Sequence, residues 1–248
     1  MISIKSAQDL EIMREGGRIL ASVMKELGAM VEPGVTPRQI DQRGHELITK
    51  AGGVPSFLDY NGFPASVCIS VNEAIVHGIP DDRELQPGDI VGLDLGVFLG
   101  GFHTDSAWTF PVGEISETTQ RLLNVTRESM YQGIAKAKAG NRIGDVSATI
   151  QKYVESNGYS VVTELVGHGI GKSLHEEPSV PNYGKPGRGP AIREGMTFCV
   201  EPMVNQGTPK TKTLADKWTM ITADRKLSAH FEHTIAITKN GPVILTTD

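Results

Sequence analysis

The chain has 248 residues, which suits one large domain with a sizeable core, and its 24 basic and 29 acidic residues give a net charge of −5. This near balance leaves no basic footprint for nucleic acid, the charged amino terminus excludes a signal peptide, and no apolar run is long enough to span a membrane. The two cysteines, Cys68 and Cys199, predict free thiols in a reducing compartment, the cytoplasm. No exposed apolar stripe is evident in the sequence, so we expect a monomer.

Two amphipathic helices are predicted at the start of the chain. The first runs from a capping residue at Ser6 to Met30, because apolar side chains recur there at helical spacing. The second begins at Thr36 and ends before Gly52. Strand-like segments follow in residues 66–76.

Residues 90–110 are predicted to form a β-hairpin around a glycine-containing turn. If Leu99 and Gly100 form the turn, Asp94 and Asp105 are direct cross-strand neighbours, with Cβ atoms roughly 4.5 to 5.5 Å apart. A turn one residue later keeps both on the same face. Two carboxylates so placed repel unless a cation lies between them, so the hairpin predicts a metal site with two divalent ions about 3.5 to 4 Å apart.

The order of elements repeats in the second part of the chain. Further helices are predicted at residues 116–139, capped by Ser116, and at residues 144–156. A shift of 106 residues superposes the two helix pairs at their glycines. We favour an internal duplication, with halves of about 1–113 and 114–248, and coincidence is the alternative.

Acidic residues follow the same repeat. A shift of 107 residues carries Asp94 onto Glu201, and a further gap of twenty brings Asp105 onto Glu232. The fold class predicted from this pattern is α+β: a single pseudo-twofold domain over residues 1–248, with a central, mostly antiparallel sheet that carries the site and helices on its outer face.

All four carboxylates interrupt apolar, β-branched runs, where burial is costly unless they are paired or coordinated. A single aspartate in a strand is more often a solvated residue, so the prediction rests on the set. Adding one imidazole suits two divalent ions of the Mn, Fe, Co or Zn type, whereas Ca or Mg would be satisfied by oxygen alone. His168, between glycines in LVGHGIG, is the best candidate, and His175 and His77 are the other placed imidazoles. For each histidine the alternative is an ordinary surface or core residue.

The segments HGIP, GHGIGKSLHEEP, VEPM and FEHT, together with the two aspartates eleven residues apart, resemble the type I methionine aminopeptidases, M24 metallopeptidases of the pita-bread fold. The resemblance extends over nearly all 248 residues. Without an amino-terminal zinc finger or linker, the chain resembles the short bacterial form. It also lacks the helical insert of type II enzymes.

The resemblance implies a ligand set for two divalent metal ions, with a water or hydroxide between them as the nucleophile. Asp94 would bind one metal, Asp105 and Glu232 would bridge both, and His168 and Glu201 would complete the other.

The resemblance also implies catalytic roles beyond the metals. Glu201 would shuttle protons, His175 would hydrogen-bond the scissile carbonyl, and His77 would contact the peptide nitrogen side. Asn72 and Ser228 fall where relatives bind a monovalent cation, and His233 beside Glu232 would support that ligand.

A methionine pocket is implied around positions that share apolar or polarisable character. These are Tyr60, Phe63, Cys68, His77, Leu174 and Trp218. Leu174 stands where many relatives carry an aromatic residue, and Phe63 replaces a common tyrosine, which should alter pocket shape but not the reaction.

The implied activity is removal of the initiator methionine from nascent proteins with a small second residue, near the ribosome. A proline-directed relative such as a prolidase or aminopeptidase P is a second interpretation, although those enzymes usually carry an additional amino-terminal domain. A non-catalytic binding module is the third, although all five ligand positions are present. Activity should fall toward about pH 5 to 6, because the ligands must be deprotonated to bind metal.

Overall fold

A nine-stranded sheet forms the centre of the computed structural model, which describes residues 1–247. Its strands are β1 (Val54–Pro55), β2 (Cys68–Val71), β4 (Ile90–Leu99), β5 (Phe102–Pro111), β7 (Gly167–Gly169), β8 (Glu176–Val180), β9 (Thr197–Val200), β14 (Glu232–Thr238) and β15 (Gly241–Ile244). The strand order is β1–β4–β5–β14–β9–β7–β8, with β2 beside β4 and β15 beside β14. All described pairs are antiparallel, as predicted.

Two sheets of three strands flank this centre. The first has the order β13 (Ser228–His230), β10 (Met203–Asn205) and β6 (Ser160–Val161), and the second has the order β11 (Thr211–Thr213), β12 (Met220–Thr222) and β3 (Ala74–Val76). A 3₁₀ turn, η1 (Tyr60–Gly62), follows β1.

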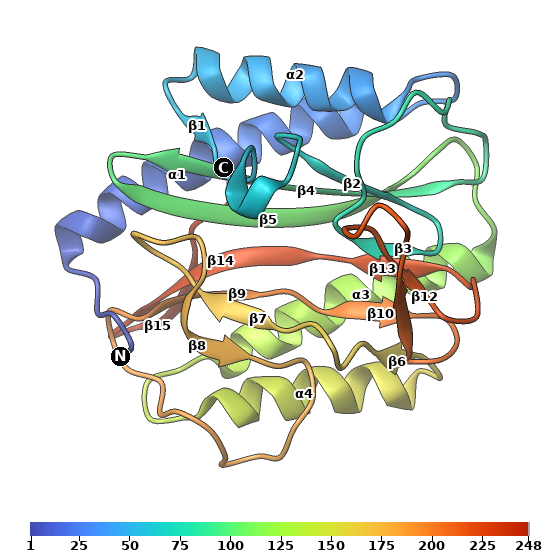
Figure 1. Cartoon of the computed structure of the whole chain (residues 1–248). Helices are drawn as coiled ribbons and strands as arrows, with labels where there is room; N and C mark the ends of the chain where they lie inside the picture. Colours follow the sequence, from blue (N-terminus) through green and yellow to red (C-terminus); the bar gives the residue numbers. More distant parts are fainter. Residues whose placement is uncertain (248) are drawn as a thin grey trace.

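Four helices lie in two pairs on either side of the molecule (Figure 1). They are α1 (Ala7–Ala29), α2 (Pro37–Lys50), α3 (Glu117–Lys136) and α4 (Ile143–Ser156). The predicted caps are confirmed, because the hydroxyls of Ser6, Thr36 and Ser116 each accept a backbone N–H of the first helical turn. Within residues 1–247, no helix combines the length and apolarity needed to cross a bilayer.

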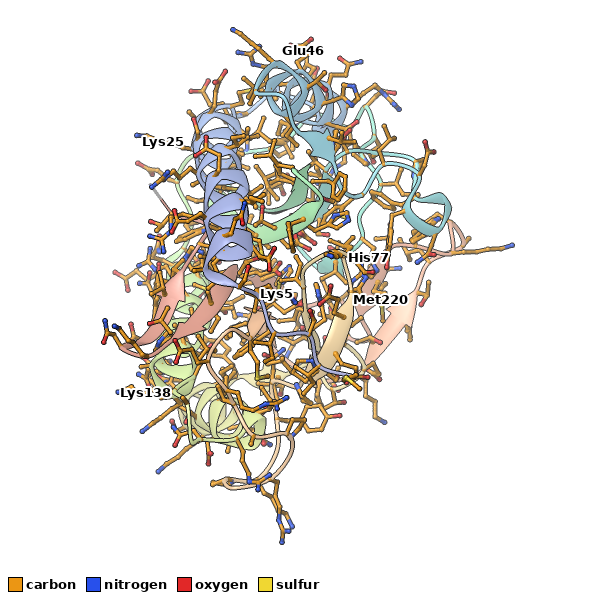
Figure 2. The ribbon with its side chains drawn as sticks, turned by 90° about the vertical axis from the view of Figure 1, so that its left-hand side faces the viewer. Lys5, Lys25, Glu46, His77, Lys138 and Met220 are labelled. Atoms are coloured by element: carbon orange, nitrogen blue, oxygen red, sulfur yellow. The ribbon has the colours of Figure 1, made fainter. Side chains whose placement is uncertain are left out.

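Each helix pair packs on its own part of the sheet. Leu20 and Leu27 of α1 pack in one buried cluster with Leu93 of β4, whereas Ile134 of α3 packs in another with Phe198 of β9. Figure 2 shows Lys25 and Glu46 on the outer helices at one end of the molecule, Lys138 at the other end and His77 between them. The predicted arrangement, with helices covering the outside of the sheet, is confirmed.

The hairpin β4–β5 pairs at ten positions, and its turn is formed by Gly100 and Gly101. Their φ angles of 57° and 90° are those of the left-handed region, which glycine adopts without strain. Of the two turn positions left open by the sequence, the one at Leu99 and Gly100 is therefore excluded and the one a residue later is confirmed. Asp94 pairs with Ala107 rather than with Asp105, but the two aspartates still share one face, offset by two positions.

Candidate metal centre

One row of the central sheet brings together residues from four strands. Cys68 of β2 is in register with Asp94 of β4, Asp94 with Ala107 of β5, and Ala107 with Glu232 of β14. Residues in register on antiparallel neighbours point to the same face. The row therefore places two of the predicted ligands on the face opposite Leu93, which packs against the helices.

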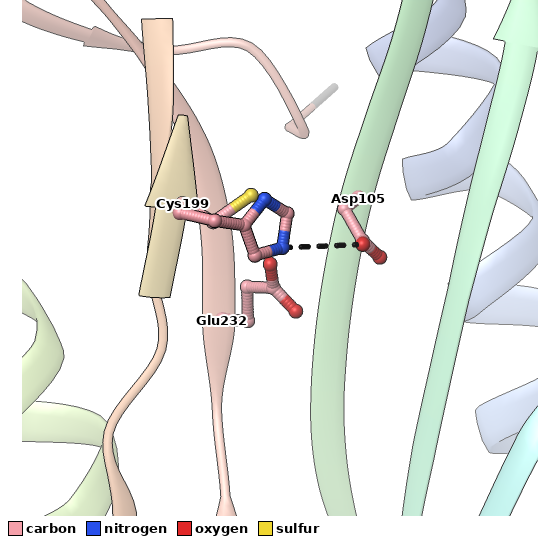
Figure 3. A group of neighbouring side chains, drawn as sticks. Asp105, Cys199 and Glu232 are labelled. Atoms are coloured by element: carbon pink, nitrogen blue, oxygen red, sulfur yellow. Dashed lines mark ion pairs between the residues drawn. The ribbon is translucent and has the colours of Figure 1, made fainter. Parts of the chain in front are cut away.

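The second half of the chain adds a histidine and a glutamate to this face. His168 lies in β7, and Glu201 directly follows β9. The His168 Nε2 atom is 3.5 Å from Glu201 Oε1 and 4.0 Å from Asp105 Oδ2, and the dashed line in Figure 3 marks the contact with Asp105. Figure 3 also shows Asp105, Cys199 and Glu232 on separate strands around a common point.

Two groups of potential ligand atoms share Glu232. Within each group the ligand atoms lie within 4.8 Å of one another: Asp105, His168, Cys199 and Glu232 in the first, and Glu201, His230 and Glu232 in the second. Four of the five predicted ligands are thus brought together directly. Asp94 belongs to neither group, but it lines the same cavity as the other four predicted ligands.

Several buried atoms of this cluster have no hydrogen-bond partner. They are Asp94 Oδ1, Asp105 Oδ1, Glu201 Oε1, Glu232 Oε1 and His230 Nε2. A buried carboxylate without a partner is costly, and four of them in one place repel one another. Oxygen and imidazole nitrogen donors fit a divalent transition-metal ion, which would supply the missing partners.

Burial favours the uncharged form of each group in this cluster, so it raises the pKa of the carboxyl groups and lowers the pKa of the imidazole. Burial raises the pKa of Asp105 to about 7, and burial together with the neighbouring carboxylates raises the pKa of Asp94, Glu201 and Glu232 well above their ordinary values. Burial also lowers the pKa of His168 to about 3. The His168 ring is therefore neutral at pH 7 and available to coordinate a metal.

The prediction from the sequence missed His230 and Cys199. His230 Nε2 lies 3.6 Å from Glu201 Oε2, and burial lowers the pKa of His230 to about 3. Both residues stand two positions before a predicted ligand, His230 before Glu232 and Cys199 before Glu201. Because strand side chains alternate, a period of two from each glutamate could have identified them.

A cavity of about 240 Å³ opens beside the cluster. All seven residues predicted to contact substrate line it: Tyr60, Phe63, Cys68, His77, Leu174, His175 and Trp218. The five predicted metal ligands line the same cavity, together with His230, which the prediction lacked. Phe63 and Trp218 meet edge to face with ring centroids 5.2 Å apart, which fixes one apolar wall.

His175 is held from two sides. Its Nδ1 atom is 2.8 Å from the Tyr60 hydroxyl, and its ring centroid is 4.1 Å from that of His168. Tyr60 reaches this position from the short turn η1, where Asp59 and Asn61 have φ angles of 62° and 52°. The loop before β2 and the loop before β8 therefore meet across the cavity.

Two further predicted groups lie outside the cavity. The Ser228 N–H donates to the Asn72 carbonyl at 3.0 Å, and the Ser228 hydroxyl donates to Asn205 Oδ1 at 2.8 Å. His233 lies on the opposite face of β14 from Glu232, with its Nδ1 2.8 Å from Thr246 Oγ1. The hypothesis that His233 supports Glu232 directly is therefore wrong, because alternation along the strand turns its ring away.

The fold and the donor cluster together define a hydrolase-like metal centre, and comparisons with known proteins narrow this class. Residues 11–239 match the description "Metallopeptidase family M24". The chain is 52% identical over 246 residues to methionine aminopeptidase 1 of Bacillus subtilis, covering 99% of both chains. A crystal structure of methionine aminopeptidase from Thermotoga maritima superposes with a TM-score of 0.99 at 42% identity, covering 100% of both chains.

A more distant structure shares the fold alone. The prolidase from Pyrococcus furiosus has a TM-score of 0.81 at 22% identity, with 99% of this chain and 65% of that chain covered. The matches over nearly the full length decide the assignment: the chain belongs to metallopeptidase family M24. The predicted resemblance and fold are confirmed.

Proposed function

We propose that the chain is a metal-dependent aminopeptidase that removes amino-terminal methionine from polypeptides whose second residue is small. Its relatives named methionine aminopeptidase match over nearly the whole chain. The proposed substrates are the amino termini of nascent polypeptides, met in the cytoplasm near the ribosome. The enzyme would act as a monomer, with residues 1–248 as one catalytic domain of two related halves.

One observation carries this proposal: a single cavity is lined both by the unpartnered donor cluster and by an apolar, sulfur-compatible wall. The proposed ligands of two divalent ions of the Co, Mn, Fe or Zn type are Asp94, Asp105, His168, Glu201 and Glu232. When bound, such ions polarise a carbonyl oxygen and lower the pKa of water toward neutrality. Asn72 and Ser228 are the proposed site of a monovalent cation.

Proton transfer and contacts with the peptide bond are assigned to side chains of the protein. Glu201 is proposed to pass a proton to the leaving amine, and burial together with the Asp105 charge raises the pKa of its carboxyl group. The Tyr60 hydroxyl occupies His175 Nδ1, which leaves His175 Nε2 for the scissile carbonyl oxygen. His77, whose pKa burial lowers, is proposed to meet the peptide nitrogen side as a neutral ring.

The wall of the cavity gives a physical reason for methionine. Leu174 and Phe63 are buried, and Cys68 lies beside them in the same apolar cluster. A thioether packs well against aromatic edges and sulfur. A cavity of about 240 Å³ also limits the length of the side chain that it accepts.

The test uses metal-stripped protein reconstituted with Mn²⁺ and the peptides Met-Ala-Ser, Met-Leu-Ser and Ala-Pro, with release of the first amino acid measured by chromatography. We expect methionine release from Met-Ala-Ser alone, and only with metal. Preferential cleavage of Ala-Pro, or full activity after removal of metal, would contradict the proposal.

A further inference from the structure

One edge of strand β14 pairs with β5 before Thr234 and with β15 after it. Along the same edge, β14 pairs with β5 at Glu232 and His233, and with β15 from Ile235 onward. Thr234 stands between these two ladders, and its backbone carbonyl accepts the Leu245 N–H of the chain that follows β15 at 2.9 Å. The backbone carbonyl of Thr234 is therefore hydrogen-bonded to the segment after β15 and not to β5.

The side chain of Thr234 makes the bonds to β5 that its backbone does not. The Asp105 N–H donates to Thr234 Oγ1 at 2.9 Å, and the same hydroxyl donates to the Asp105 carbonyl at 2.8 Å. A hydroxyl is both donor and acceptor, so one group satisfies both backbone groups of Asp105. Thr234 is fully buried and Asp105 is 4% exposed, so water cannot readily take over these bonds.

A second threonine makes the same bridge at the other end of the short β5–β14 ladder. The Thr109 hydroxyl donates to the His230 carbonyl at 2.8 Å and accepts the His230 N–H at 3.0 Å. The two bridges are equivalent in chemistry and in burial, but they hold different residues. Thr234 holds Asp105, one of the five proposed ligands, whereas Thr109 holds His230, which belongs to the second group of potential ligand atoms.

We propose that Thr234 is a positioning residue for the metal centre, because its hydroxyl fixes the backbone of Asp105 at the point where β5 leaves β14. The side chains of Asp105 and Glu232 extend into the space between their two strands (Figure 3). Replacing the hydroxyl by a methyl group leaves two buried backbone groups of Asp105 unpaired, so β5 moves and the separation of the two carboxylates changes. This inference rests on the proposed function, since it assumes that Asp105 binds metal.

The experiment measures Mn²⁺ binding by calorimetry, and the visible spectrum of Co²⁺ as a report of ligand geometry, on metal-stripped wild type and three variants. Thr234→Val removes the hydroxyl and Thr234→Ser keeps it. The control is Thr126→Val, which removes a fully buried hydroxyl that donates to the Leu122 carbonyl within α3, outside the metal-ligand groups. We expect Thr234→Val to weaken Mn²⁺ binding by about 10- to 100-fold, as loss of supporting contacts typically does, and to change the Co²⁺ spectrum. Thr234→Ser should restore the wild-type spectrum and most of the affinity.

Thermal unfolding of the metal-free forms separates positioning from general destabilisation. Thr126→Val and Thr234→Val should both lose stability, but only Thr234→Val should lose most of its affinity for Mn²⁺. If Thr234→Val does not fold, Thr234→Ala replaces it with the same expectation. Wild-type affinity in Thr234→Val or Thr234→Ala, or equal weakening in Thr126→Val, would overturn the inference alone. A wild-type protein that binds no divalent ion would overturn the proposed function and the inference together.

Discussion

The two halves of the molecule differ in the strands that carry their site residues: these strands are continuous in the first half and interrupted in the second. In the first half, Asp94 and Asp105 lie inside unbroken ten-residue strands that pair with each other along their whole length. In the second half the corresponding stretches are interrupted, because Glu201 and Pro202 separate β9 from β10, and Phe231 separates β13 from β14. A shift of 106 residues still lays the bounds of α2 on those of α4.

The interruptions have a chemical cause and a consequence. Pro202 has no N–H to donate to a ladder. The Glu201 carbonyl accepts Asn182 Nδ2 at 3.0 Å instead of a strand N–H, and the Phe231 N–H donates to the Pro202 carbonyl at 3.4 Å. In the first half a continuous local hairpin carries both aspartates, with one added side-chain bridge from Thr234 to the Asp105 backbone. At Glu201 the second half has no such ladder, and the Asn182 side chain takes its place.

The largest expected effect is the loss of a shared carboxylate. Glu232→Gln and Asp105→Asn, one change in each half, should each lower kcat/KM for Met-Ala-Ser by at least about 100-fold, beyond the range typical of supporting residues. Both changes replace a buried acid that is costly to ionise with a neutral amide of similar shape, so the metal-free variants should be at least as stable as wild type in thermal unfolding. Near-normal turnover in either variant would remove that residue from the proposed metal set.

Substitution of Asn182 tests directly whether the second half depends on a side-chain contact where the first half has a continuous hairpin. Its side chain is fully buried and makes the long-range bond to Glu201. Asn182→Ala should lower kcat/KM and Mn²⁺ affinity by about 10-fold, at the lower end of the range for supporting contacts. The matched change in the hairpin turn, Gly101→Asn, should leave both values within about 3-fold, because asparagine tolerates a positive φ. Equal losses in the two variants would show that the metal centre depends on the local hairpin turn as much as on the Asn182 bond, and the contrast between the halves would fail.

The stability of the protein should depend most strongly on pH when the metal has been removed. The raised pKa of Asp105, about 7, means that the metal-free fold holds this proton more tightly than the unfolded chain does, so its stabilisation is complete below about pH 4 and is lost as pH rises through 7. The other three carboxylates shift in the same direction. His168 and His230 act oppositely, with pKa values lowered from 6.5 to about 3, but their effect ends above about pH 6.5.

Between about pH 6.5 and 8.5 the carboxylates therefore decide the trend. We expect the unfolding midpoint of metal-free protein to fall by several degrees over this range, since about 1 kcal/mol corresponds to 2 to 4 °C for a chain of this size. The stabilisation by Mn²⁺ should grow over the same range, because metal binding releases protons. A metal-free midpoint that rises with pH would contradict the pKa directions of the cluster.

A smaller effect is expected at the contact that joins the two halves across the cavity. Tyr60→Phe keeps the aromatic wall but removes the hydroxyl that holds His175 Nδ1. Loss of one such bond should lower kcat by about 3- to 10-fold with little change in KM. A variant that changes KM alone would show that the Tyr60 hydroxyl serves binding rather than the orientation of His175.

The smallest expected effect is at the helix caps, where the two halves have the same local structure and should lose the same stability on substitution. Ser6 caps α1 and Ser116 caps α3, each by accepting an N–H three residues later. Ser6→Ala and Ser116→Ala should each lower the free energy of unfolding by about 1 kcal/mol. Clearly unequal losses in denaturant titrations would show that the two helix pairs contribute differently to stability.

The local parts of the fold could be predicted from the sequence, and the long-range parts could not. Helix caps and the hairpin follow from neighbouring residues, although two consecutive glycines left the turn ambiguous by one position. The register of β14 against β5 depends on residues more than 120 positions apart, and no local pattern specifies it. For that reason the bridge from Thr234 to Asp105 and the bond from Asn182 to Glu201 were absent from the prediction.

The same limit applies to the site. Four carboxylates in apolar runs could be recognised because a buried charge needs a partner. His230 escaped recognition because a histidine in a strand has common structural roles. Its position two residues before Glu232 was the signal in the sequence, and its 3.6 Å approach to Glu201 shows its place in the cluster. The contact between Tyr60 and His175 joins two loops 115 residues apart, which spacing alone does not indicate.

The most direct test is an anomalous-scattering map from crystals soaked in Mn²⁺ or Co²⁺. Two peaks are expected, enclosed by Asp94, Asp105, His168, Glu201 and Glu232, at the inner wall of the cavity that Tyr60 and Trp218 also line. A map with no peak among these side chains, or with their carboxylates directed to separate regions of the molecule, would contradict the proposed metal centre.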